Sequence, residues 1–252
     1  MYHIIDMPKS AQEAKFCCQP SEFIKQMQYL AASDYPLLNL NDIASILSGN
    51  KELLEDSVAV TFDDGFDDFY YNALPILSRY KIPATLFMIS NRIDQYNDWM
   101  VSKGSPKRKL LSIEQLNELL KAGVVIGSHT RAHPKLSEIS NNTEQLYQEV
   151  GASKIELENI LDIPINHFAY PYGLYNDDVV ESVKQSGYLT ACSTRSGFNR
   201  LNIDRFLLRR IEVYGSDSLW QFKQKMMFGS NEMSGLFLIK YWWFRAKSKL
   251  FF

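Results

Sequence analysis

The sequence predicts an α/β fold, a distorted (β/α) barrel of about seven parallel strands. Short apolar runs alternate with helical patterns between residues 2 and 213, and this alternation favours parallel pairing through βαβ units. Of the 252 residues, 46% are hydrophobic and 22% are charged, which is typical of a folded globular chain. The net charge of −2 leaves no basic excess, so we expect no nucleic-acid partner.

Apolar runs with strand character and amphipathic stretches with helical character set the predicted order of elements. The predicted strands cover residues 2–5, 36–40, 57–62, 84–89, 124–127, 166–170, 188–193 and 206–213. The predicted helices cover residues 22–32, 43–47, 67–80 with a kink or boundary at Pro75, 113–121 capped by Ser112, 142–161 and 176–185. Residues 90–110 are polar and irregular and form the longest predicted loop. In such barrels the chemistry lies at the carboxyl ends of the strands.

We expect two parts, the barrel over residues 1–215 and a helical, amphipathic C-terminal tail over residues 216–252. In the tail, residues 236–244 are apolar except for Lys240, and basic and aromatic residues follow. This pattern suits peripheral membrane contact, although a terminal helix that packs on the barrel is the favoured interpretation. No basic start followed by an apolar run suggests export, and no run approaches the ~20 apolar residues of a membrane span. The expected location is therefore cytoplasmic, with membrane association through the tail as an extension.

Two adjacent carboxylates, Asp63 and Asp64, directly follow the apolar strand predicted to end at Phe62. The negative charges of two adjacent carboxylates repel each other, and a cation or a proton between them removes this repulsion. Gly65 permits a sharp turn at this point. The plainer alternative is that Asp64 only caps the helix that follows.

Two of the four histidines, His129 and His133, follow the strand predicted at 124–127. Imidazoles at this spacing converge on one ion if the backbone turns helically between them. With Asp64 they would make a site of two imidazoles and one carboxylate with open positions for water and substrate. Such a ligand set suits Zn²⁺, and Co²⁺, Ni²⁺ or Mn²⁺ are further candidates.

A third cluster, Tyr170-Pro171-Tyr172-Gly173, follows the strand predicted at 166–170. Pro171 fixes one backbone torsion and Gly173 frees another, so the Tyr172 N–H between them can be held toward the site. A fixed N–H donor of this kind stabilises an oxyanion. Without the other two clusters, a simple turn with packed aromatic side chains would be the better interpretation.

At these three clusters the chain resembles the polysaccharide deacetylase family, which contains the NodB-type chitooligosaccharide deacetylases. The matching segments are Thr61-Phe62-Asp63-Asp64-Gly65, His129-x-x-x-His133 and Tyr170-Pro171-Tyr172-Gly173, in the family's order. The resemblance implies removal of N-acetyl groups from N-acetylhexosamine units of a polysaccharide, oligosaccharide or lipid-linked sugar. It implies Asp63 as general base, Asp64, His129 and His133 as metal ligands, and Tyr172 as oxyanion donor. Candidate substrate-binding residues are His3, Tyr170, Pro171 and Arg210.

Two departures from the family pattern concern the arginine that supports the catalytic acidic residue and the histidine that acts as general acid. Many members carry an arginine at the start of the third cluster, where this chain has Ala169, and many carry a late histidine that acts as general acid. After His167 this chain contains no histidine, and the segment around Arg210 is similar to a subgroup with arginine on that strand. His3, near another strand end, is a candidate proton donor, whereas His167 is expected to be structural.

Alternatives from other classes remain open at this point. The departures allow a non-catalytic carbohydrate-binding relative, and the same apparatus could hydrolyse a non-sugar amide. A magnesium enzyme acting on diphosphates is suggested by Asp63-Asp64 with Asp67-Asp68, but Mg²⁺ does not call for two histidines.

Overall fold

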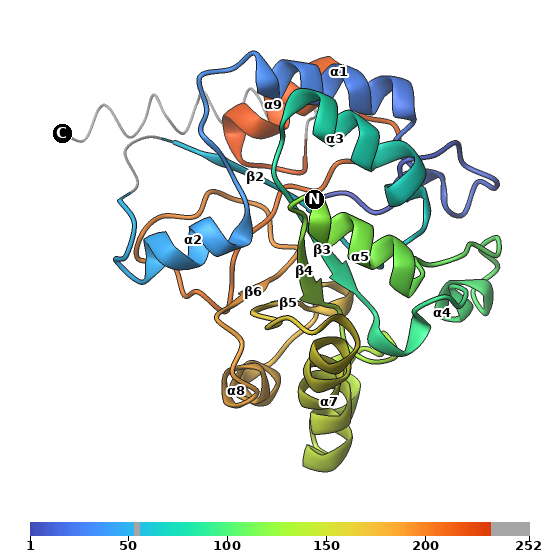
Figure 1. Cartoon of the computed structure of the whole chain (residues 1–252), viewed down its shortest axis with the longest axis vertical. Coiled ribbons are helices and arrows are strands. Elements are labelled where there is room, and N and C mark those ends of the chain that lie inside the picture. The colour runs from blue at the N-terminus through green and yellow to red at the C-terminus, as the bar shows by residue number, and fades with distance from the viewer. Residues whose placement is uncertain (53–55, 233–252) are drawn as a thin grey trace.

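The computed structural model describes residues 1–52 and 56–232 of the chain and has the α/β architecture expected from the sequence (Figure 1). Six strands form one parallel sheet in the order β1-β2-β3-β4-β5-β6. The strands are β1 (Leu37–Leu38), β2 (Val58–Phe62), β3 (Ala84–Met88), β4 (Val125–Ser128), β5 (His167–Ala169) and β6 (Thr190–Cys192). Every ladder is parallel because a helix or a long excursion separates each pair of consecutive strands.

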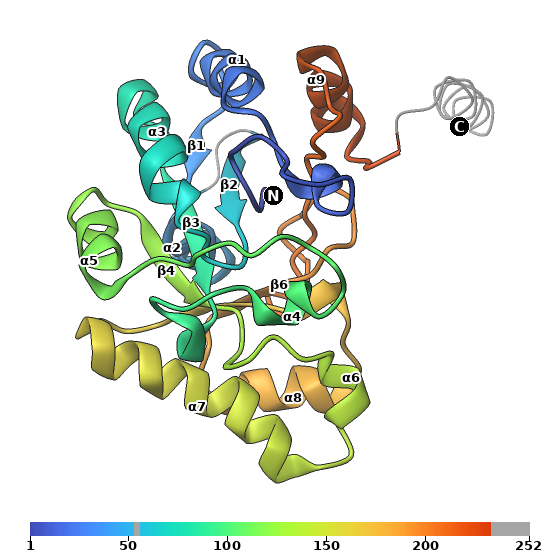
Figure 2. The ribbon, with the colours of Figure 1, turned by 90° about the vertical axis from the view of Figure 1, so that its right-hand side faces the viewer.

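Helices lie outside the sheet and connect the strands (Figures 1 and 2). They are α1 (Pro20–Ala31), α2 (Leu40–Leu47), α3 (Leu74–Tyr80), α4 (Asp98–Val101), α5 (Ile113–Lys121), α6 (Leu136–Ile139), α7 (Thr143–Leu161), α8 (Asp177–Gln185) and α9 (Leu219–Phe228). Short 3₁₀ or π segments cover Ala14–Phe16, Phe69–Ala73, Ser90–Arg92 and Pro171–Gly173. The capping box predicted at Ser112 is present, and Pro75 stands at the start of α3, where the predicted boundary falls.

The two outermost predicted strands, residues 2–5 and 206–213, are not strands in the structure. Each contributes isolated parallel bridges instead, Tyr2 to Phe62 and Leu208 to Cys192. The two segments then meet, because Val213 N–H donates to Met1 C=O at 3.0 Å. Their backbones therefore complete the ring between β6 and β2, and the distorted barrel is confirmed with fewer regular strands than predicted.

Strand alternation divides the buried side chains between two faces. The main core lies between the sheet and the helices and contains Phe62, Leu86 and Phe168. The intervening residues Phe87 and Ala169 face the other way and join Leu40, Cys192 and Leu208 in a smaller cluster. Asp63 follows Phe62 and is placed on this second face, where the strands end.

The helix α9 belongs to the predicted tail and packs on α1, where the Phe222 ring contacts Tyr29 at 6.3 Å. It begins with a capping box at Ser218 and ends at Gly229 in a left-handed conformation. No helix in the described ranges is both long enough and apolar enough to cross a membrane. The apolar run at 236–244 lies outside the described residues, so the proposed tail boundary and its membrane contact stay predictions.

Candidate metal centre

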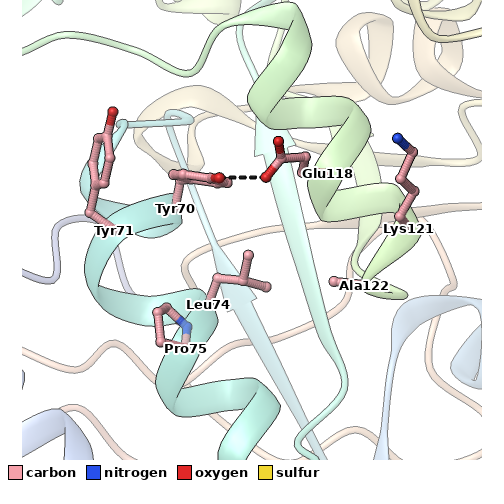
Figure 3. Close-up of a pocket in the computed structure, with 7 residues that line it drawn as sticks. All are labelled: Tyr70, Tyr71, Leu74, Pro75, Glu118, Lys121 and Ala122. Atoms are coloured by element: carbon pink, nitrogen blue, oxygen red, sulfur yellow. Dashed lines mark hydrogen bonds between the residues drawn. The ribbon is translucent and has the colours of Figure 1, made fainter.

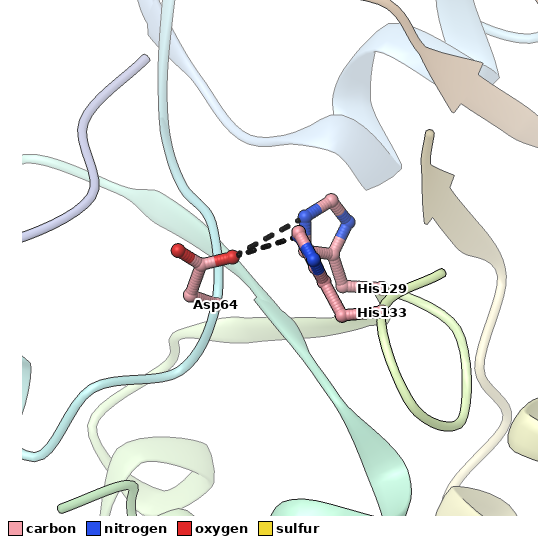
Figure 4. Close-up of side chains that lie close together, drawn as sticks. All are labelled: Asp64, His129 and His133. Carbon is pink, nitrogen blue, oxygen red and sulfur yellow. Dashed lines mark ion pairs between the residues drawn. The ribbon is translucent and has the colours of Figure 1, made fainter. Parts of the chain in front are cut away.

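The side chains of Asp64, His129 and His133 come together at the carboxyl ends of β2 and β4 (Figure 4). Their three ligand atoms all lie within 4.8 Å of one another, and all three residues are buried. Asp64 Oδ1 lies 3.4 Å from His129 Nε2 and 3.3 Å from His133 Nε2. These distances exceed those of good charge-assisted hydrogen bonds, as expected for three atoms that surround a cation.

The backbone around this cluster is held in an uncommon conformation. Asp64, Thr130 and His133 have φ values of 74°, 69° and 62°, in the left-handed region that non-glycine residues seldom adopt. The Thr130 hydroxyl accepts the His133 N–H at 2.9 Å and tightens the turn that carries the second imidazole. The turn is therefore not the regular helical turn expected from the spacing, yet it brings both imidazoles to one point. Strain concentrated at three neighbouring positions is typical of functional sites.

The donor atoms suit a divalent transition metal. His129 Nδ1 lies 2.7 Å from Ala169 C=O, so Nδ1 carries the proton and the Nε2 lone pair faces Asp64. Burial raises the pKa of Asp64, but the interaction with the two nearby imidazoles outweighs it and holds that pKa well below 3.8. Within the described chain, Asp64 Oδ1 and His133 Nδ1 have no good hydrogen-bond partner. A buried, ionised carboxylate beside two imidazole nitrogens is a fitting set of zinc ligands.

The two histidines respond differently to burial. Burial lowers the pKa of His129, but Asp64 and Asp63 outweigh it, so the pKa is raised from 6.5. Burial also lowers the pKa of His133, and there the carboxylate does not compensate, so the pKa is lowered. The negative field of the two aspartates therefore attracts positive charge to this point.

Asp63 lies beside this centre in a buried ion pair with Arg210. Arg210 Nη1 donates to Asp63 Oδ1 at 2.6 Å and Nη2 to Oδ2 at 2.8 Å, a two-point contact. Both side chains are nearly inaccessible, with 5% and 3% exposed. Burial raises the pKa of Asp63, but the charges of Arg210 and His129 outweigh it, so the pKa falls below 3.8. Asp63 is thus held as an oriented carboxylate.

Arg210 was a candidate for substrate contact, and the structure gives its guanidinium a different use. Besides Asp63, the guanidinium donates to Ser193 C=O at 2.9 Å through Nε. It supports the Asp63 carboxylate from the late segment of the chain, whereas many family members carry a supporting arginine at the position of Ala169. The sequence showed an arginine late in the chain, but its pairing with Asp63 could not be predicted, because that pairing depends on closure of the ring.

The other candidate residues fall into two groups. The Tyr170 side chain is fully buried and donates to Phe206 C=O at 3.1 Å, and Pro171 is also buried, so substrate binding by these side chains is not supported. Tyr172 is 39% exposed and has a left-handed φ of 58°. Its ring lies 4.7 Å from that of His133. The Tyr172 backbone is fixed by Gly173, where a side chain would collide with Thr194 at 1.9 Å.

The two histidines outside the cluster differ in their surroundings. His167 is buried between Thr190 and Asn41, 2.8 Å from each, and burial lowers its pKa to about 4, which agrees with the structural role expected from the sequence. His3 is half-buried, and its Nδ1 has no partner among the described residues. The His3 ring contacts the Phe16 ring at 5.1 Å, and the residue before it, Tyr2, accepts the Asp63 N–H at 3.0 Å, so the backbones of His3 and Asp63 lie close together.

The sequence did not reveal a wall formed by the predicted loop 90–110. Trp99 packs against the His133 ring at 5.1 Å and against the Phe66 ring at 6.1 Å. Lys103 donates to the Tyr172 hydroxyl at 2.9 Å. This excursion therefore flanks the Asp-His-His cluster. In the sequence, only its aromatic residues indicated such a role.

Asp67 and Asp68 do not form a second cation site with other described residues. Asp68 accepts the Ile5 N–H at 2.5 Å, and burial raises its pKa to about 7. Within the described ranges, the Asp-His-His group is the one set of ligating side chains that converges. A groove of about 580 Å³ between α3 and α5 lies elsewhere and contains none of these residues (Figure 3). The geometry therefore does not favour a diphosphate clamp built with Asp67 and Asp68.

Comparison with known proteins agrees with this geometry. Residues 50–191 match the sequence profile of the family described as Polysaccharide deacetylase. The chain is 33% identical to the Poly-beta-1,6-N-acetyl-D-glucosamine N-deacetylase of Staphylococcus epidermidis, covering 83% of this chain and 72% of the relative. It is 29% identical to the Putative polysaccharide deacetylase YxkH of Bacillus subtilis, covering 84% and 70%.

Among solved structures, the Streptococcus pyogenes deacetylase PplD in complex with acetate is similar with a TM-score of 0.76 and 28% identity. The match covers 90% of this chain and 96% of that one. The fold, the converging Asp-His-His cluster and these relatives agree with one another. The chain therefore belongs to the polysaccharide deacetylase family, whose members are hydrolases that act on carbon–nitrogen bonds.

Proposed function

We propose that this protein is a metal-dependent N-deacetylase that acts on N-acetylglucosamine units of a polysaccharide or of a lipid-linked sugar. The observation that carries the proposal is the convergence of Asp64, His129 and His133 beside the buried Asp63–Arg210 pair. Relatives named for poly-β-1,6-N-acetyl-D-glucosamine support this glycan as the first substrate to test. Zinc is the preferred metal for a site of two imidazoles and one carboxylate, with Co²⁺, Ni²⁺ and Mn²⁺ as alternatives.

Asp64, His129 and His133 would hold the ion, which supplies Lewis acidity and lowers the pKa of a water molecule toward neutrality. Asp63 accepts the proton of the attacking water, and Arg210 keeps its carboxylate ionised and fixed in direction. The Tyr172 N–H donates to the developing oxyanion. The Tyr172 N–H is not the donor in either hydrogen bond of its turn, which join Gly173 N–H to Tyr170 C=O and Leu174 N–H to Pro171 C=O.

His3 is the proposed donor of the proton to the leaving amine. Tyr2 pairs with Phe62, and its ring stacks on Phe62 at 5.4 Å, so these two side chains share the outer face. The next residues on the two segments are His3 and Asp63, and alternation along the two segments predicts that they turn toward the other face. The hydrogen bond from Asp63 N–H to Tyr2 C=O at 3.0 Å supports this proposal, because it holds the residue before His3 against Asp63. Asp63 in its acid form is the alternative donor.

Release of acetate from β-1,6-linked N-acetylglucosamine oligomers tests the proposal. Wild-type protein loaded with Zn²⁺ should release acetate, whereas Asp63→Asn should release none and still retain its metal. Near-wild-type turnover by Asp63→Asn would show that the assigned base is wrong. Binding of the oligomer without acetate release by the wild type would favour a non-catalytic carbohydrate-binding protein.

Membrane contact through residues 216–252 is a separate part of the proposal. The apolar run at 236–244 and the basic residues after it suit the face of a membrane that presents a lipid-linked substrate. A flotation assay with liposomes compares the full chain with a truncation after Gly229. We expect only the full chain to float, and equal behaviour would refute the contact.

A further inference from the structure

Lys103 places a positive charge at the rim of the metal centre. It lies just beyond α4 on the excursion between β3 and β4, and its Nζ donates to the Tyr172 hydroxyl at 2.9 Å. The same Nζ lies 4.6 Å from the centre of the Tyr172 ring, in cation–π range. Since the Tyr172 ring lies 4.7 Å from that of His133, the ammonium group stands one ring away from a proposed metal ligand.

The charge of Lys103 is not neutralised by a carboxylate. Over residues 1–52 and 56–232, Lys103 takes part in no ion pair, whereas other lysines near this side of the molecule do. Lys135 pairs with Glu138 at 2.7 Å, and Lys109 pairs with Asp94 at 2.8 Å. Lys103 is also exposed, so its field reaches a ligand that approaches Tyr172 from solvent.

The proposed reaction changes the charge of its own substrate. Each turnover replaces a neutral acetamide by an amine, which carries a positive charge when protonated. A glycan segment that was hydrolysed once therefore presents a cation beside the next N-acetyl unit. At a separation of one sugar, like charges near a protein surface change an equilibrium by roughly two- to tenfold.

We propose that Lys103 is a specificity-determining residue that disfavours glycan segments already carrying a free amine next to the unit to be hydrolysed. The inference rests on the proposed deacetylase function. Repulsion by Lys103 weakens binding of such segments and favours release of the product, while fully acetylated segments meet no opposing charge. Free amines are consequently spaced along the polymer rather than placed on consecutive units.

The test compares two β-1,6-linked tetramers, one fully N-acetylated and one with a single glucosamine beside an N-acetyl unit. The measured quantity is the ratio of their kcat/KM values. We expect the wild type to favour the acetylated tetramer roughly two- to tenfold, and about 0.5 M NaCl to reduce this ratio toward one. Lys103→Met should also bring it toward one, Lys103→Glu should invert it, and Lys103→Arg should keep it.

Lys107→Met is the matched control. Lys107 belongs to the same excursion and makes the same kind of contact, with Nζ 3.8 Å from the centre of the Tyr96 ring, but it does not touch Tyr172. Its ratio should equal that of the wild type.

The outcomes separate this inference from the function on which it rests. If Lys103→Met slows both tetramers equally and keeps the wild-type ratio, Lys103 only holds Tyr172 in place and charge selection is refuted. A wild-type kcat/KM ratio of one for the two tetramers would also refute charge selection. If the wild type hydrolyses neither tetramer, the proposed function itself fails and the inference falls with it.

Discussion

Replacing Arg210 by methionine removes the cation that compensates the buried carboxylate of Asp63. The lost contacts are two charge-assisted hydrogen bonds of 2.6 and 2.8 Å between side chains that are 5% and 3% exposed. Breaking a buried pair by deleting one partner costs about 3–5 kcal/mol, because the other charge stays buried. For a chain of this size, that corresponds to a fall in Tm of roughly 6–20 °C.

The same substitution should alter the pH dependence of catalysis. Burial raises the pKa of Asp63, and the Arg210 charge is the largest influence that opposes it, so the pKa of Asp63 must rise in Arg210→Met. A general base has to be deprotonated, so the acidic limb of the kcat/KM profile should move to higher pH. Arg210→Lys keeps the charge without the two-point geometry, so its acidic limb should lie between those of the wild type and Arg210→Met.

Chemical denaturation and pH–rate profiles measure the two effects. Arg209→Met is the matched control, because Arg209 is the exposed neighbour and its side chain lies by Gly197, away from Asp63. The control should stay within about 0.5 kcal/mol of the wild type. If Arg210→Met matches the wild type in both stability and acidic limb, the ion pair does not hold Asp63 and this reasoning is wrong.

Further expectations concern the ligands, the backbone and the buried acid. His129→Ala should lose its zinc in metal analysis, and stoichiometric retention would contradict that ligand assignment. His3→Gln should lower kcat with little change in metal content, and unchanged turnover would leave Asp63 as the proton donor. Gly173→Ala should reduce kcat and stability together, because its Cβ would lie 1.9 Å from Thr194 Oγ1 at a φ of +67°; a wild-type melting curve would argue against this clash. Asp68 has a folded pKa of about 7, above its unfolded value, so its folding penalty grows as pH rises from about 4 to 7. Asp68→Asn should therefore stabilise the protein at pH 8 on the order of 2–4 kcal/mol and be neutral near pH 4 in urea titrations. A pH-independent difference would remove this explanation.

The parallel core and the Asp-His-His cluster could be predicted from the sequence because both depend on local patterns. The apolar run before Asp63 and the strand before His129 fix where the carboxylates and imidazoles leave the sheet. Parallel strands share one carboxyl edge, so clusters distant in the chain had to meet there. This reasoning needs no knowledge of side-chain contacts.

Features that depend on closure of the ring were not accessible in the same way. Residues 206–213 look like a strand, but they form no regular ladder. Leu208 bonds to Ala191 and Ser193, Arg210 N–H donates to Arg195 C=O, and Val213 N–H donates to Met1 C=O. Only this closure brings Arg210 to Asp63, so the sequence suggested a substrate contact instead. The wall built by Trp99 and Lys103 was missed because an irregular excursion has no periodicity from which its contacts can be inferred.

The ring closes through a seam of few backbone bonds, and that seam carries His3, Asp63 and Arg210. Tyr2 C=O accepts the Asp63 N–H at 3.0 Å, and the 206–213 segment adds only scattered bonds on the other side. Segments with few backbone bonds open at lower free energy than the regular core. Mild denaturant should therefore abolish activity while the amides of β2–β5 are still protected from hydrogen exchange. Loss of activity would then measure the opening of this seam and not the unfolding of the whole protein.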